Sequence, residues 1–240
     1  MCNLAVTNVC NARCDFCNYA SDKHLVAKGL FADYDRYCKT LDLLSRNGVR
    51  FLSMVGGEPT LHPQLLAMVG YAAQSGIRPS IVTNGSRLWP RFVRDLAQSG
   101  LKSLFISIDS ASRELHEKNR GLPGVCERIR EAVGECKRRN IQVVASVTIN
   151  KLLGSIPALF TFLCELGIET VDFSYPKRML HSSALSFSET SPLIDFSAGE
   201  LGENLETIRS FKSRYKILNS RESIAEVLRF LRKEEQLYPC

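Results

Sequence analysis

The sequence predicts an α/β protein, a partial (βα)6 parallel barrel followed by a short helical C-terminal extension. Short runs of β-branched and other apolar residues alternate with helical patterns along most of the chain. These runs begin 24 to 47 residues apart, close to the length of a right-handed strand–helix–strand crossover. The six predicted strands are Leu4–Thr7, Phe51–Val55, Ser80–Thr83, Leu104–Ile108, Val143–Ile149 and Thr170–Tyr175.

Helical periodicity fills the intervals between these runs. Asp33 can cap a helix whose apolar side chains recur every three or four residues up to Leu44. Pro63 and Pro123 each precede a similar apolar stripe, and proline is well tolerated in the first turn of a helix. Two more helices are predicted over residues 91–98 and 156–166.

The chain divides into two predicted parts at residue 178. Residues 1–178 form the core domain, and residues 179–240 form a serine-rich connector with a helical extension. Six serines and no helical stripe occupy residues 176–198, and an irregular segment of this length is typical of a lid or a linker. We expect it to cover the site. Helices are predicted over residues 198–215 and 221–236.

Composition indicates a soluble globular chain with an ordinary core. Hydrophobic residues make up 45% and charged residues 23% of the 240 positions. The longest stretch without a charged residue, 59–77, contains histidine, proline and glutamine, so we expect no membrane span. The net charge of +6 is spread along the chain, and a nucleic-acid partner is therefore not expected.

The nine cysteines are odd in number and unevenly spaced, unlike a disulfide framework. Only three residues precede the first predicted strand, so we expect no signal peptide and a reducing, cytoplasmic setting. Clustered thiols in that compartment typically bind metal. Four cysteines on predicted helices are expected to be core or boundary residues: Cys38, Cys126, Cys136 and Cys164.

Alternation along the strands predicts a polar lumen. One face of each later strand is apolar and can pack under the helices, whereas the other face is polar. A closed eight-stranded barrel fills its interior with branched apolar side chains, so a polar interior indicates an open barrel that holds a ligand. The polar positions are Ser107 and Asp109 on the fourth strand, Gln142, Ser146, Thr148 and Asn150 on the fifth, and Asp172 and Ser174 on the sixth.

Cys10, Cys14 and Cys17 follow the first predicted strand within eight positions. On a helix this spacing would make one buried stripe of small residues. Polar neighbours such as Arg13 and Asp15 favour instead a loop at the carboxyl end of the strand, where barrel chemistry is placed. A structural zinc site and a simple electron-transfer cluster each take four ligands. A core stripe, a zinc site and a cluster with one open iron are therefore the alternatives.

The cysteine motif, CxxxCxxC with Phe16 before the last cysteine, resembles the signature of the radical S-adenosylmethionine (radical SAM) enzymes. The resemblance extends from the first predicted strand to the sixth. It implies a [4Fe–4S] cluster bound by Cys10, Cys14 and Cys17, with S-adenosylmethionine (SAM) on the fourth iron, and it places Phe16 beside the cofactors.

Two glycine-containing motifs after the second and third strands resemble SAM-contacting segments of that family. GGEPTL places Gly56 and Gly57 where backbone carbonyls approach the SAM amino group, and Glu58 where a carboxylate can accept from an ammonium. TNG places Thr83 beside the pocket, and a turn without that role is the alternative.

Polar residues after strands four and five extend the resemblance. Ser107 and Asp109, in SID, resemble the pair that contacts the ribose or methionine part of SAM. Arg120 follows a short helix, where the family has an arginine paired with the SAM carboxylate, an anion that suits a guanidinium. Asn150 resembles a ribose-contacting position. His116, on the helix before Arg120, is expected to be exposed.

The resemblance implies reductive cleavage of SAM to methionine and a 5′-deoxyadenosyl radical, with an electron from a flavodoxin- or ferredoxin-type reductant. The radical would remove hydrogen from an unidentified peptide or small-molecule substrate. Tyr175, Lys177 and Arg178 would bound the adenine or the substrate, and Cys240 resembles the approach to the auxiliary-cluster (SPASM or twitch) region of radical SAM maturases. A non-catalytic iron–sulfur or zinc module and an RNA-modifying radical enzyme stay open as alternatives.

Overall fold

Seven parallel strands form one sheet whose order follows the chain. The structure, a computed structural model, describes residues 1–21, 28–176 and 191–238. Each strand pairs in parallel with the next. This winding in one direction is that of a barrel, because a doubly wound sheet reverses its strand order. The strands are β1 (Cys2–Thr7), β2 (Phe51–Gly56), β3 (Arg78–Thr83), β4 (Ser103–Ile108), β5 (Gln142–Thr148), β6 (Thr170–Ser174) and β7 (Lys216–Ile217).

The predicted α/β partial barrel is confirmed, with one addition. All six predicted strands are present, with ends that differ by one or two residues. The added strand, β7, pairs with β6 through only two residues, which is too short for any alternation to appear in the sequence. The sheet is open: among the described residues, β1 pairs with β2 and β7 with β6, and the two edge strands do not meet.

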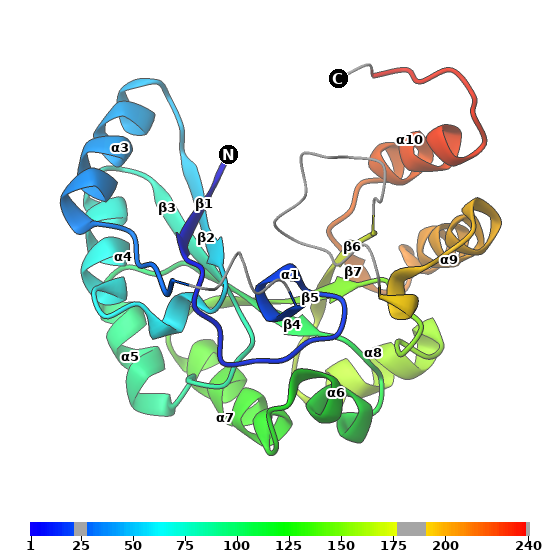
Figure 1. Ribbon diagram of the computed structural model, residues 1–240, viewed down its shortest axis with the longest axis horizontal. Helices are drawn as coiled ribbons and strands as arrows, with labels where there is room; N and C mark the ends of the chain where they lie inside the picture. Colours follow the sequence, from blue (N-terminus) through cyan, green and yellow to red (C-terminus); the bar gives the residue numbers. More distant parts are fainter. Residues whose placement is uncertain (22–27, 177–190, 239–240) are drawn as a thin grey trace.

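Apart from the short helix at Asn18–Ser21, which lies inside it, the helices form an arc along the outer side of the strands (Figure 1). Asp33 caps α3 as predicted, its carboxylate accepting from the Arg36 backbone N–H at 2.9 Å. The two C-terminal helices end earlier than predicted. The elements are α1 (Asn18–Ser21), α3 (Tyr34–Arg46), η1 (Pro59–Leu61), α4 (Leu65–Gln74), α5 (Pro90–Gln98), α6 (Arg113–Arg120), α7 (Val125–Arg138), α8 (Ile156–Glu165), η3 (Pro192–Ile194), α9 (Ala198–Phe211) and α10 (Arg221–Leu231).

The hydrophobic core fills the space between the sheet and this arc. Met54, Ile106 and Val147 are fully buried on their strands, and helix residues such as Leu41 and Ile129 pack into the same cluster. Alternating positions on the strands face the other way, away from the helices. The core thus fixes which side chains line the inner face of the barrel.

The C-terminal helices pack onto the same core. Leu205 of α9 and Ile224 of α10 belong to the cluster that includes the barrel residues, and the Phe160 and Tyr215 rings stack with centroids 3.5 Å apart. The predicted boundary at residue 178 falls outside the described residues. Cys126 and Cys136 are buried and Cys38 is half-buried, as expected, but Cys164 is exposed on the outer side of α8. None of the described helices is long and apolar enough to cross a bilayer.

Candidate functional site at the carboxyl ends of the strands

The three clustered cysteines lie in the loop that follows β1. Residues 8–17 are not helical, and α1 begins only at Asn18, so a buried helical stripe is excluded as the reason for their spacing. Cys14 is 8% exposed, and Cys10 and Cys17 are half-buried. The loop is tied to the end of β1 by Thr7, whose hydroxyl donates to the Leu30 carbonyl at 2.7 Å and accepts from the Val9 backbone N–H at 3.0 Å.

Burial controls the chemistry of these thiols. It raises the pKa of all three and is the largest influence on each; for Cys14 the pKa rises to about 12. The Arg120 guanidinium acts in the opposite direction on every one of them. The thiols are therefore protonated at neutral pH in the absence of a metal, and a bound cluster would have to displace those protons.

The Gly56–Gly57–Glu58 loop lies against the cysteine loop at backbone contact distance. The Gly57 N–H donates to the Thr7 carbonyl at 2.8 Å, and the Glu58 N–H donates to the Val9 carbonyl at 2.7 Å. A Cβ at Gly57 would lie 2.2 Å from the Val9 carbonyl oxygen, and one at Gly56, where φ is 132°, would lie 2.1 Å from the Thr7 carbonyl oxygen. Only glycine permits this approach at both positions.

The Glu58 carboxylate is enclosed by donors of the protein itself. Its Oε1 accepts from the Thr60 backbone N–H, from the Thr60 hydroxyl and from the Thr83 hydroxyl at 3.0, 2.6 and 2.7 Å. Its Oε2 accepts from the Asn84 backbone N–H at 2.7 Å, and the residue is 1% exposed. Glu58 therefore joins the loops after β2 and β3, which is a different use from the ammonium contact expected of it.

Two asparagines that the sequence analysis did not single out complete this connection. The Asn84 side-chain amide donates to the Asn11 side-chain carbonyl at 2.9 Å, and the Asn11 amide donates to the Ser86 hydroxyl at 2.9 Å. The loops after β1, β2 and β3 are thus one hydrogen-bonded unit. The position of Asn84 inside the TNG motif was the available signal for its role.

A second buried network follows β4. Arg120 donates to the Asp109 carboxylate from Nη2 at 2.6 Å, and Asn119 donates to its other oxygen at 2.8 Å. The Asn150 side-chain amide reaches the Asp109 backbone carbonyl at 2.8 Å, so the ends of β4 and β5 are joined. The Arg120 carbonyl accepts from the Arg13 backbone N–H at 2.8 Å, which ties this network to the cysteine loop.

Arg120 is a buried cation that keeps one unused hydrogen-bond donor among the described residues. Burial alone would lower its pKa, but the charge of the Asp109 carboxylate and the hydrogen bond to it outweigh that effect and raise it. Its Nε has no hydrogen-bond partner among the described residues although it is buried. A buried donor without a partner is costly, and the group is therefore suited to an anionic ligand that arrives at the site.

The expectation that His116 is exposed is wrong. The side chain is fully buried, on the face of α6 that also carries Arg120 one turn later. Its Nδ1 accepts from the Asp109 backbone N–H at 3.1 Å, which assigns the proton of the neutral ring to Nε2. Burial lowers its pKa to about 4. The helix carries few apolar residues, so its buried face is polar and was misassigned.

The other predicted residues lie around these networks. Phe16 is buried in the cysteine loop, and Ser107 is half-buried on the inner face of β4, two residues before Asp109. Tyr175 follows the end of β6. Lys177, Arg178 and Cys240, and most of the serine-rich segment, lie outside the described residues.

A family model for the radical SAM superfamily matches residues 4–154, which is more than half of the chain and includes all of the networks above. The chain belongs to the radical SAM superfamily. Members of this superfamily are enzymes that bind a [4Fe–4S] cluster and SAM.

Named radical SAM relatives and a solved structure agree with this assignment. The chain is 31% identical over 163 residues to an AdoMet-dependent heme synthase of Methanosarcina barkeri, covering 68% of this chain and 46% of that protein. It is 27% identical over 244 residues to a GTP 3′,8-cyclase of Pseudomonas aeruginosa, covering 97% of this chain and 68% of that one. Streptococcus suis SuiB bound to SAM superposes with a TM-score of 0.70 at 17% identity, covering 90% and 48% of the two chains.

This chain spans about half the length of the first of these relatives and of SuiB. The likeness to SuiB shows the fold, and the sequence matches show the superfamily. The whole protein's reaction and substrate follow from neither.

The residues present fit the radical SAM cofactors. Cys10, Cys14 and Cys17 lie in one loop at the carboxyl end of β1, and cysteine thiolates are the ligands that hold iron–sulfur clusters. The close glycine loop and the unpartnered Arg120 Nε also fit a ligand at this edge.

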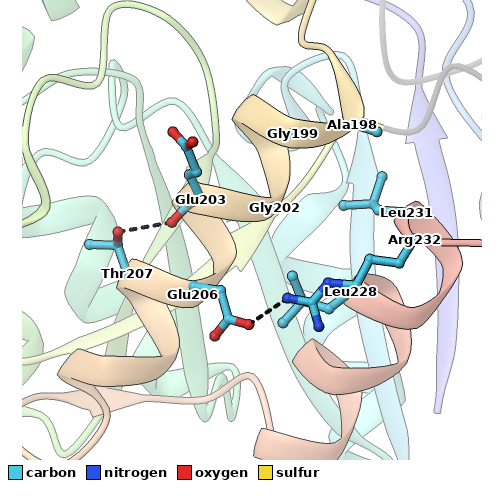
Figure 2. Close-up of a pocket in the computed structure, with 9 residues that line it drawn as sticks. All are labelled: Ala198, Gly199, Gly202, Glu203, Glu206, Thr207, Leu228, Leu231 and Arg232. Atoms are coloured by element: carbon cyan, nitrogen blue, oxygen red, sulfur yellow. Dashed lines mark hydrogen bonds and ion pairs between the residues drawn. The ribbon is translucent and has the colours of Figure 1, made fainter.

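A separate cavity of about 510 Å³ lies between α9 and α10 (Figure 2). Gly202 and Leu228 line it, and at its rim Arg232 donates to the Glu206 carboxylate at 3.0 Å. None of the predicted site residues lines this cavity. The cavity is therefore separate from the candidate site at the carboxyl ends of β1 to β5.

Proposed function

We propose that this chain is a radical SAM enzyme in which Cys10, Cys14 and Cys17 hold a [4Fe–4S] cluster and SAM occupies the remaining iron. When bound, the two cofactors supply reductive cleavage of SAM to a 5′-deoxyadenosyl radical, which removes hydrogen from the substrate. The observation that carries the proposal is the group of three thiols, one buried and two half-buried, beside the buried Arg120 guanidinium in a chain of this superfamily.

The protein's own residues would position SAM in three ways. The Gly56–Gly57 backbone lies against the cysteine loop with no side chain in between, so its carbonyls are accessible to an ammonium. Arg120 has donors left after its bond to Asp109 and suits the SAM carboxylate. Ser107 and Asn150, at the ends of β4 and β5, would contact the ribose. Glu58 and Thr83 act by holding the loops together.

Arg120 would also favour cluster assembly. Its positive charge lowers the pKa of each thiol against the larger effect of burial, and so stabilises the thiolates that bind iron. Asp109 keeps the guanidinium in place and offsets the cost of burying it.

The substrate is a peptide or a small molecule. The heme synthase and the GTP 3′,8-cyclase are named for small molecules, whereas SuiB has been solved with its precursor peptide SuiA. We further propose a flavodoxin- or ferredoxin-type reductant and a cytoplasmic location, where the reducing poise keeps the cluster ligands as free thiols.

The test is anaerobic reconstitution of the purified chain with iron and sulfide. We expect about four irons and four sulfides per chain, and 5′-deoxyadenosine after addition of dithionite and SAM. Cys14→Ala should lose both, whereas Cys164→Ala, which removes an exposed thiol on α8, should lose neither.

Two results would argue against the proposal. If the Cys14→Ala chain still assembled a normal [4Fe–4S] cluster, Cys14 would not be one of its ligands. Zinc without labile sulfide in the wild-type chain would favour a non-catalytic metal-binding module.

A further inference from the structure

The inner face of the sheet has an apolar row of side chains and, nearer the carboxyl ends of the strands, a polar row. Buried helix-facing residues alternate with inner positions along every strand, so the inner set can be assigned from the core. The apolar row crosses β1 to β5 through Ala5, Val55, Val82, Phe105 and Val144. The polar positions lie further towards the carboxyl ends of β4 to β6 and are Ser107, Ser146, Thr148, Asp172 and Ser174.

Strand register places the polar residues side by side. Ser107 pairs with Ser146, and Ser146 pairs with Asp172, so the three form one row across β4, β5 and β6. Thr148 pairs with Ser174 in the next row towards the carboxyl ends. Neighbouring strands lie about 4.8 Å apart, so hydroxyls and carboxylate make one continuous hydrogen-bonding surface. All five side chains are half-buried, which leaves them partly accessible.

Asp172 is the one acidic residue in β1 to β6. Within the described parts of the chain, no hydrogen bond or ion pair compensates its carboxylate, and burial raises its pKa. A partly buried carboxylate without a partner costs stability, and a serine at this position would not. Such groups are concentrated at functional sites. The role of Asp172 therefore lies in what it binds.

We propose that Ser146, Asp172 and Ser174 form the substrate-binding wall of the barrel, and that Asp172 binds a protonated amine on the substrate. The inference rests on the proposed function, because it places the substrate on the inner face next to the SAM site. Ser107 connects the two, since Asp109, the partner of Arg120, follows two residues later.

The charge and polarity of the two rows define the substrate class. An ammonium gains a charge-assisted hydrogen bond from Asp172, and the neighbouring hydroxyls of Ser146 and Ser174 can accept its remaining protons. The apolar row, with Val82, Phe105 and Val144, suits a hydrocarbon chain. A carboxylate or phosphate on the same part of the substrate would be repelled. The expected substrate is an aliphatic amine, free or as a side chain.

Three probes of equal length test this on the cluster-loaded chain with SAM: n-pentylammonium, n-pentanol and pentanoate. Binding is measured from the relaxation of the probe signals in nuclear magnetic resonance. We expect the wild-type chain to bind the ammonium at least about tenfold more tightly than the alcohol, and pentanoate more weakly than both. Asp172→Asn should remove that preference by weakening ammonium binding alone. Asp35→Asn, the same change on the outer side of α3, should leave it intact.

The outcomes separate the inference from the proposed function. A chain that carries the cluster and cleaves SAM but shows no preference for the ammonium overturns the substrate wall alone, with no variant needed. If Asp172→Asn weakens SAM binding but keeps the preference for the ammonium, Asp172 contacts SAM. That result also overturns the substrate wall. If Asp172→Asn does not fold, Ser146→Ala serves instead and should weaken ammonium binding several-fold. A wild-type chain without cluster or SAM cleavage contradicts the proposed function, and the inference with it.

Discussion

The Glu58 carboxylate accepts a hydrogen bond from the Asn84 backbone N–H at 2.7 Å, across two loops that are 26 residues apart in the sequence. The carboxylate accepts three further hydrogen bonds from Thr60 and Thr83, so each of these four hydrogen bonds comes from a donor of the protein. A carboxylate has acceptor sites for all four, and no other side chain of this length is acceptor-only. The acid in GGE is thus required by the architecture of the site.

Glu58→Gln should destabilise the fold. The glutamine NH₂ group must face either the threonine donors or the Asn84 N–H, so at least one buried donor loses its acceptor. We expect a loss of about 1–3 kcal/mol in the free energy of unfolding, measured with urea on the cluster-free chain. Glu114→Gln, exposed on α6, should change it by less than about 0.5 kcal/mol. Weaker SAM binding with unchanged stability would instead restore the ammonium contact predicted from the sequence.

Gly57→Ala should separate the loops after β1 and β2. The new methyl carbon would meet the Val9 carbonyl oxygen at 2.2 Å, and a backbone atom cannot rotate away as a side chain can. Overpacking costs about 1–3 kcal/mol where side chains can adjust, so we expect the upper end of that range together with poor cluster loading.

The matched control is Gly134→Ala in α7. There the nearest atom to the new methyl would be Arg138 Nη1 at 3.8 Å, which is ordinary contact. Alanine in a helix interior should raise stability by about 0.5–1 kcal/mol. Equal effects of the two substitutions on cluster loading would show that close backbone approach at Gly57 is not required.

Arg120→Ala should do more than weaken SAM binding. It leaves the buried Asp109 carboxylate without its cation, and breaking such a pair costs about 3–5 kcal/mol. It also removes the charge that lowers the thiol pKa values, so cluster reconstitution should require a higher pH.

Two comparisons isolate the role of this pair. Arg113→Ala on the same helix removes a half-exposed arginine 3.9 Å from Glu127 and should cost less than about 1 kcal/mol. Adding Asp109→Asn to Arg120→Ala should recover part of the lost stability, because the second change removes the uncompensated charge. No recovery would show that packing, not charge, accounts for the loss.

The strands were predictable because burial imposes alternation on them. Val143 to Ile149 has apolar residues at every second position, and these are the ones that pack under the helices. β7 escaped prediction because two residues carry no period. Helix ends were less well defined, since Phe211 and Leu231 precede further polar residues that would be compatible with helix.

The location of the candidate site was predictable from the sequence, but the hydrogen-bond partners within it were less so. Cysteines, glycines and polar residues follow consecutive parallel strands, whose carboxyl ends necessarily meet at one edge of the sheet. Which donor meets which acceptor depends on loops far apart in sequence: Asn150 reaches Asp109 across 41 residues, and Thr83 reaches Glu58 across 25. Periodicity holds no information about those pairs, and it equally gave no reason to bury His116 on a polar helix.

That buried His116 should make stability depend on pH. Its pKa falls from an ordinary 6.5 to about 4 in the folded chain, chiefly through burial and then through the charge of Arg120. Between these values the unfolded chain binds a proton that the folded chain does not. Stability should therefore be lost as the pH falls from about 6.5 to about 4, by about 3 kcal/mol at most. Protonation at Nδ1 would also break the hydrogen bond that this atom accepts from the Asp109 N–H.

His116→Gln tests this by keeping an acceptor for the Asp109 N–H while removing the titrating ring. Urea unfolding of both chains at several pH values between 7 and 4 gives the difference directly, and shared acid effects cancel. Those shared effects come from carboxylates such as Glu117 and Glu135, whose lowered pKa values place their contribution at lower pH. We expect the wild-type curve to fall more steeply below pH 6.5. Parallel curves would mean that His116 exchanges no protons on unfolding, and that its burial has no part in the acid sensitivity of the site.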